Sequence, residues 1–108
     1  MSNSITPASR TLQRRLIVEE FKEFLEAEQQ LIMGLKVNAS ECLKELADLV
    51  YVCYQYAANL GWDLDEALDR VHKSNMSKLD DNGNPIYRED GKVLKSKNYQ
   101  PPNLTDLV

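Results

Sequence analysis

The sequence predicts an all-α protein that ends in a short C-terminal β-hairpin and an extended tail. Apolar residues recur at helical spacing in three segments, and capping residues or glycines bound these segments. From Asp80 onward, turn residues and short apolar–polar runs replace that pattern, which is typical of a hairpin. The expected arrangement is one domain of residues 1–108, with helices over about 7–33, 39–60 and 64–76 and with the hairpin and tail over 80–108.

The first predicted helix begins at a proline. Thr6 offers an N-cap, and Pro7 takes the first helical position, where an N–H would have no helical partner. Leu12 and Leu16 open a series of apolar residues at helical spacing, and Gly34 is suited to end the helix.

The second predicted helix is apolar around most of its circumference. Asn38 and Glu41 match a capping box, which predicts that the helix begins there, and Gly61 predicts its end. One narrow polar stripe consists of Glu41, Glu45, Asp48, Gln55 and Asn59. Such a helix must be covered on several sides, so we expect a dimer or a larger assembly. The alternative is that the stripe is simply the solvent edge of a buried helix.

The third predicted helix begins at a second capping box, formed by Asp63 and Glu66. Asn75 and Lys78 lie at its end, with His72 one turn earlier. A polar, cationic helix end of this kind can hydrogen-bond a phosphate or a sugar, or it can simply complement the helix dipole.

Asp90 and Gly91 lie between two short apolar–polar runs and predict the turn of the β-hairpin. The tail that follows carries cations and Tyr99, then Pro101 and Pro102. Such a tail can close over an anionic ligand, or it can act as a strap that tightens a dimer.

Charge is distributed unevenly along the chain. The net charge of −4 over 108 residues disfavours a nucleic-acid polymer as partner, yet seven Lys or Arg and only four Asp or Glu lie between Arg70 and Lys97.

Cys42 and Cys53 lie in one predicted helix, too far apart to form a disulfide bond there, and suit a reducing compartment. No stretch has the length and apolarity of a signal peptide or a membrane span, so we expect a cytoplasmic protein without a membrane partner.

Two pairs of carboxylates are the strongest candidates for a functional site. Glu20 and Glu23 lie on the first predicted helix, and Glu45 and Asp48 lie on the second. Residues three apart share a helix face, so each pair forms one oxygen-rich patch, and the patches meet if the helices pack antiparallel. Converging carboxylates take up protons or recruit a counter-charge, and Mg²⁺ prefers such oxygen ligands. The alternative is four solvated acids on the surface.

The carboxylate motifs resemble those of the MazG-like all-α nucleoside triphosphate pyrophosphohydrolases, a superfamily with dimeric dUTPases and phosphoribosyl-ATP pyrophosphohydrolases. The resemblance rests on Glu19-Glu20-x-x-Glu23, Glu45-x-x-Asp48, the Val71–Lys78 stretch and the Asp90–Pro101 ending. It implies a helical bundle completed by oligomerisation, as a homodimer or homotetramer. It also implies that Mg²⁺, or Mn²⁺ in its place, holds the phosphates of a nucleotide while water splits it into a monophosphate and pyrophosphate.

The resemblance further implies roles for individual residues. The metal ligands would be Glu20, Glu23, Glu45 and Asp48, and Glu19, or Glu20 in a dual role, would orient or deprotonate the attacking water. The implied contacts to the sugar or phosphates of the substrate are Asn75, Lys78, Lys92, Lys95 and Tyr99. The expected activity is hydrolysis of an NTP or dNTP for nucleotide-pool control. Two alternatives remain: a non-catalytic helical dimerisation module with an acidic groove for a partner, and a phosphoribosyl-ATP pyrophosphohydrolase.

Overall fold

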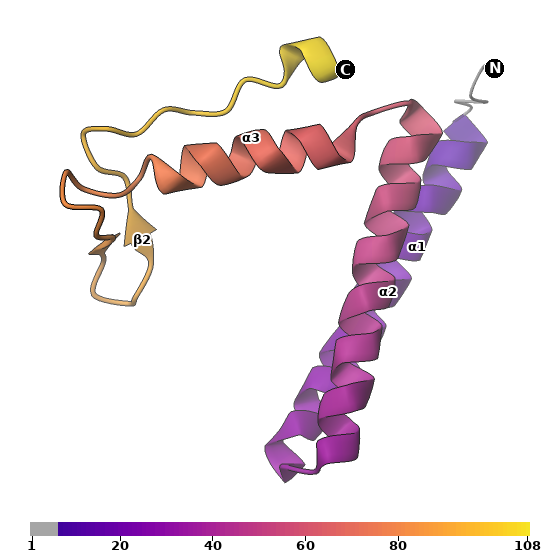
Figure 1. Ribbon diagram of the computed structural model, residues 1–108. Helices are drawn as coiled ribbons and strands as arrows, with labels where there is room; N and C mark the ends of the chain where they lie inside the picture. The colour runs from indigo at the N-terminus through magenta and orange to yellow at the C-terminus, as the bar shows by residue number, and fades with distance from the viewer. Residues whose placement is uncertain (1–6) are drawn as a thin grey trace. The chain divides into compact units, whose positions relative to one another are not determined.

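The computed structural model describes residues 7–108, and it is mainly helical (Figure 1). The elements in chain order are α1 (Pro7–Gln29), the 3-10 helix η1 (Gln30–Met33), α2 (Lys36–Leu60), α3 (Leu64–Met76), β1 (Ile86–Tyr87), β2 (Val93–Leu94) and the 3-10 helix η2 (Thr105–Leu107). The predicted fold class, three helices followed by a small hairpin, is confirmed. The chain divides into two compact units, Met1–Trp62 and Asp63–Val108. The predicted N-cap Thr6 lies outside the described residues.

A glycine turn reverses the chain between α1 and α2. Gly34 ends η1 with φ 68°, a left-handed conformation that costs glycine little, and its N–H donates to the carbonyl of Leu31 at 2.9 Å. Gly61 ends α2 in the same way with φ 75°. Both predicted helix ends at glycine are therefore confirmed.

The prediction that α2 begins at a capping box was wrong. The helix starts at Lys36 with Leu35 as its N-cap, so Asn38 already lies in the first turn. Its side-chain Nδ2 instead donates to the carbonyl of Gln30 at 3.0 Å, across the turn. The physical reason is that the carbonyls at the end of a helix lack intrahelical donors, and Asn38 satisfies one of them.

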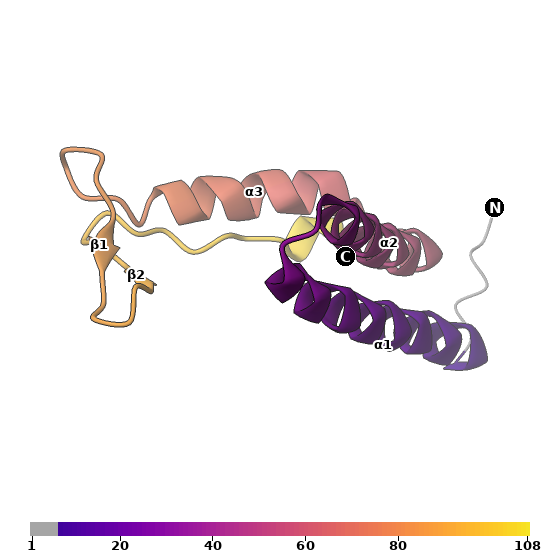
Figure 2. The ribbon, with the colours of Figure 1, turned by 90° about the horizontal axis from the view of Figure 1, so that it is seen from below.

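Helices α1 and α2 run antiparallel and lie side by side, as Figures 1 and 2 both show. The buried apolar side chains in α2 are small or medium in size, namely Cys42, Val52 and Ala57. Large apolar side chains of the same helix remain exposed, among them Leu43 at 67% and Tyr51 at 66%. The two cysteines are free thiols. The apolar circumference predicted for this helix is thus covered on one side only.

The second unit begins with the cap that the sequence predicts. The Asp63 carboxylate accepts a hydrogen bond from the backbone N–H of Glu66 at 3.0 Å and opens α3. The predicted hairpin is also present, with Ile86 paired to Leu94 and Tyr87 to Val93 in an antiparallel register.

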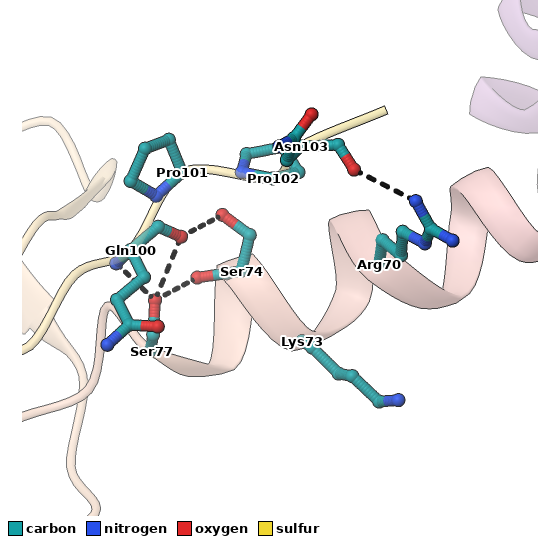
Figure 3. A pocket seen from close by; sticks show the side chains of 8 residues that line it. All are labelled: Arg70, Lys73, Ser74, Ser77, Gln100, Pro101, Pro102 and Asn103. Atoms are coloured by element: carbon teal, nitrogen blue, oxygen red, sulfur yellow. Dashed lines mark hydrogen bonds between the residues drawn. The ribbon is translucent and has the colours of Figure 1, made fainter. Parts of the chain in front are cut away.

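The C-terminal tail lies along α3 and is held by its polar side chains (Figure 3). The Ser74 hydroxyl donates to the carbonyl of Gln100 at 2.7 Å, and the N–H of Gln100 donates to the Ser77 hydroxyl at 2.9 Å. Arg70 donates to the carbonyl of Asn103 at 3.1 Å and forms an ion pair with Asp106. The tail therefore straps the helix of its own unit.

Within residues 7–108, no helix combines the length and the apolar character that crossing a membrane requires.

We predict that Ser74→Ala loosens the tail. Ser74 is 7% exposed, and its loss leaves the Gln100 carbonyl only the longer hydrogen bond from the Ser77 hydroxyl, at 3.4 Å, which costs about 0.5–1.5 kcal/mol. Amide hydrogen exchange at residues 96–106 should accelerate, and the midpoint of denaturant unfolding should fall. Ser40→Ala is the matched control, because Ser40 is an exposed serine in α2. Equal effects of both variants would contradict the assignment.

Candidate functional site

Three carboxylates from two helices converge in the seam between α1 and α2. Glu20 comes from α1, and Glu45 and Asp48 come from α2, where spacing of three residues places them on one helix face. Each offers one oxygen, and these oxygens all lie within 4.8 Å of one another. All three residues are half-buried, so solvent screens their mutual repulsion only in part. We call Glu20, Glu45 and Asp48 the carboxylate cluster.

Glu23, the fourth predicted carboxylate, is tied to the cluster through Glu20. A side-chain hydrogen bond to Glu23 is the largest cause that raises the pKa of Glu20, to about 7, and partial burial is the next. The negative charges of Glu23, Asp48 and Glu45 raise the pKa of Glu20 further. Near neutral pH the Glu20 carboxyl is therefore partly protonated, which is the expected response of carboxylates forced together.

A lysine that the sequence reasoning did not select lies beside the cluster. The Nζ of Lys44 is 2.8 Å from Oδ2 of Asp48 and 3.7 Å from Oε2 of Glu45. The hydrogen bond to Asp48 raises the pKa of Lys44, and the charges of Asp48 and Glu45 act in the same direction. Its spacing of four residues from Asp48 was the sequence signal that could have identified it.

One oxygen of the cluster still lacks a partner. Oε1 of Glu45 is buried and accepts no hydrogen bond from the described residues. A buried carboxylate oxygen without a donor is costly, so the site favours an added positive charge. The donors are all carboxylate oxygens, which suit a hard divalent cation such as Mg²⁺ better than they suit a soft metal. The residues present therefore fit a metal ion of that class.

The seam also contains amide side chains that the sequence reasoning did not place. The Ser9 hydroxyl donates to Oδ1 of Asn59 at 3.1 Å, which joins the start of α1 to the end of α2. Nδ2 of Asn59 and Oε1 of Gln13 are buried and have no hydrogen-bond partner among residues 7–108. Asn59, like Glu45 and Asp48, belongs to the polar stripe of α2 and faces α1, whereas Glu41 and Gln55 of the same stripe are exposed.

The predicted substrate contacts all lie in the second unit. Lys78, Lys92 and Lys95 line a pocket of about 440 Å³. The Nζ of Lys95 is 4.7 Å from the centre of the Tyr99 ring, a cation–π contact. Asn75 is exposed near the end of α3 and is not among the residues that line this pocket. Glu19, the predicted alternative base, is exposed on α1 beside Glu20.

Comparison with known proteins supports the resemblance seen in the motifs. The sequence model of the phosphoribosyl-ATP pyrophosphohydrolase family matches residues 2–75, a range that contains the carboxylate cluster and Glu23. The uncharacterized protein L479 of Acanthamoeba polyphaga mimivirus is 31% identical over 103 residues, an alignment that covers 66% of this chain and 41% of the viral protein. The chain therefore spans less than half the length of this relative.

We predict that the stability of the metal-free protein falls as pH rises from about 4.5 to about 7. The pKa of Glu20 increases from its ordinary 4.5 to about 7, so the folded state binds this proton more tightly than the unfolded state does. Stabilisation is present at low pH and is lost as the carboxyl ionises. Thermal unfolding in chelator should show this fall, and Glu20→Gln should remove most of it. The control Glu28→Gln, at an exposed position of α1, should retain the wild-type profile.

Proposed function

The chain belongs to the phosphoribosyl-ATP pyrophosphohydrolase family, within the MazG-like superfamily, and we propose that it is a Mg²⁺-dependent pyrophosphohydrolase of nucleoside triphosphates. The observation that carries the metal dependence is the carboxylate cluster, whose oxygens lie within 4.8 Å of one another. The unpartnered Oε1 of Glu45 supports it, because a cation would satisfy that oxygen. Mn²⁺ has a similar preference for carboxylate ligands and would substitute.

We propose that Glu20, Glu23, Glu45 and Asp48 hold the metal. The ion, when bound, would neutralise phosphate charge and lower the pKa of bound water. Cleavage of a phosphoanhydride depends on such neutralisation and on an aligned water more than on covalent chemistry. Water adds to one phosphorus, pyrophosphate leaves with the electrons of the broken P–O bond, and the proton of the water passes to a carboxylate.

Glu19, or Glu20 in a dual role, is the proposed acceptor of that proton. Glu20 is the better placed of the two, since it lies within the cluster and Glu19 is exposed. In the second unit, Asn75, Lys78, Lys92, Lys95 and Tyr99 are the proposed contacts to the sugar or phosphates of the substrate.

A second substrate follows from the name of the matched family. Phosphoribosyl-ATP carries the same phosphoanhydride and would yield pyrophosphate by the same attack of water. Release of pyrophosphate should therefore be measured on a panel of canonical and modified NTPs and dNTPs together with phosphoribosyl-ATP, with Mg²⁺ and then with chelator. Chelator-sensitive release of pyrophosphate from one compound identifies it as the substrate. If no compound of the panel releases pyrophosphate, a non-catalytic binding module is favoured instead.

Asp48→Asn and Glu45→Gln should each reduce pyrophosphate release by at least about a hundredfold, because each removes one charged ligand from the proposed metal site. Both should also reduce the rise in melting temperature that Mg²⁺ gives, since that rise reports binding to the folded state. Glu28→Gln is the control, as an exposed carboxylate on α1. Near-normal turnover in either cluster variant would exclude the proposed metal site.

We further propose that the functional form is a homodimer or homotetramer, in which both units of each chain belong to one domain. Its proposed role is control of the nucleotide pool in the cytoplasm. The family match runs from residue 2 to residue 75 and so crosses the boundary between the units. The exposed apolar side chains of α2, such as Leu43, Val50 and Tyr51, support association with a second copy. Burial of this face would add the core that a short chain lacks.

Tyr51→Glu should shift the protein towards the monomer, because it places a charge on the face that a second copy would cover. Size-exclusion chromatography with light scattering would measure the mass. Gln29→Glu adds the same charge at an exposed polar position of α1 and should leave the mass unchanged. A monomeric wild-type protein at micromolar concentration would rule out the proposed assembly.

A further inference from the structure

Lys44 contacts the carboxylate cluster although it cannot be a metal ligand there. Its Nζ is 2.8 Å from Oδ2 of Asp48 and 3.7 Å from Oε2 of Glu45. A protonated ammonium group only donates hydrogen bonds and has no lone pair to offer to a metal ion. Lys44 therefore supplies positive charge to two of the three carboxylates of the cluster.

The ion pair between Lys44 and Asp48 is easy to break. The Lys44 side chain is 61% exposed, whereas that of Glu45 is only 16% exposed. The carboxylates are thus more confined than the lysine, whose long side chain can turn its charged end into water. An exposed ion pair between residues four apart on a helix contributes little to stability, so its loss costs little.

The ammonium group and a divalent cation would compete for the same carboxylates. The oxygens of the cluster lie within 4.8 Å of one another, so an ion that they share lies close to Asp48 and Glu45. The ammonium group already lies beside both of these residues. Like charges repel strongly at such short range, and a half-buried site screens them less than bulk water does. Metal binding and the ion pair of Lys44 therefore oppose each other.

We propose that Lys44 is an exchangeable counter-cation, which neutralises Asp48 and Glu45 in the metal-free protein and moves away from them when a divalent cation binds. The proposal rests on the proposed metal site and adds a control of its affinity. Lys44 stabilises the metal-free seam and, in return, weakens metal binding. A lysine that merely supported the site would change stability and metal affinity in the same direction.

Isothermal titration calorimetry of the full chain with Mg²⁺ alone measures this exchange. Lys44→Gln should bind Mg²⁺ about two- to fivefold more tightly than the wild type, because an exposed ion pair no longer has to be broken. In chelator the same variant should melt at a lower temperature, since the carboxylates have lost their counter-charge. Lys44→Arg keeps the charge and should bind Mg²⁺ no more tightly than the wild type.

Lys36→Gln is the matched control. It removes the same charge from an exposed position at the start of α2, about two turns before Lys44 and so roughly 12 Å away along the helix axis. At about 0.1 M salt this distance exceeds the screening length, so the affinity for Mg²⁺ should change little. A gain equal to that of Lys44→Gln would show that net charge alone sets the affinity and would overturn the proposal.

NMR of the lysine side chains reports the movement itself. The signals of the Lys44 side chain, assigned by their loss in Lys44→Arg, should shift on addition of Mg²⁺ towards those of an unpaired lysine, and those of Lys36 should stay in place. Lys44 signals that do not move at saturating Mg²⁺ would contradict the exchange.

Failure of the exchange is distinguishable from failure of the metal site. If the wild type binds Mg²⁺ and Lys44→Gln binds it equally or more weakly, the exchange alone is overturned and the proposed function stands. If neither protein binds Mg²⁺, the proposed metal site and the exchange are overturned together.

Discussion

Repulsion among carboxylates in the seam of α1 and α2 is the constraint on which the first unit depends. Helix pairs usually fill such a seam with apolar side chains, whereas here Glu20, Glu45 and Asp48 bring oxygens within 4.8 Å of one another. Part of this repulsion is relieved by a proton on Glu20, whose pKa is raised, and by the ammonium group of Lys44 beside Asp48. The compensation is incomplete, since one oxygen of Glu45 stays unpaired. The repulsion and the unpaired oxygen lower the stability of the metal-free fold at a place where a bound cation can restore it, which is typical of a functional site.

The same constraint explains why so much apolar surface lies outside the helix pair. Three residues of the polar stripe of α2 face α1: Glu45 and Asp48 lie beside Glu20, and Asn59 is bonded to Ser9. Because these polar residues occupy part of the contact face, large side chains such as Leu43 and Tyr51 remain exposed. The apolar side chains of α2 that are buried are only small or medium in size. The proposed metal site and the proposed association with a second copy thus follow from one arrangement.

Local pattern predicted the fold and the cluster well, because spacing along a helix fixes which residues share a face. That rule is enough to pair Glu45 with Asp48, and glycine ends and the Asp63 cap follow from equally local chemistry. It failed at Asn38, whose side chain serves a carbonyl of the preceding turn and not its own helix. Sequence spacing also did not identify Arg88 as a pocket residue. The pocket that Arg88 lines with Lys78 and Lys92 is formed by segments that are separate along the chain, so no local spacing rule connects them.

The sequence left two roles open for the tail, a lid over an anionic ligand or a strap that tightens a dimer. Within one chain the structure shows a different contact: the tail lies along α3 of its own unit, with Gln100 bonded to Ser74 and Asp106 to Arg70. These bonds fix residues 100–106 of the tail against the helix. Lys78, Lys92 and Lys95 line one pocket beside the hairpin, and Lys95 also contacts the Tyr99 ring. We propose that anion recognition in this unit rests on these residues of the hairpin region and of the start of the tail, while residues 100–106 hold the rest of the tail against α3.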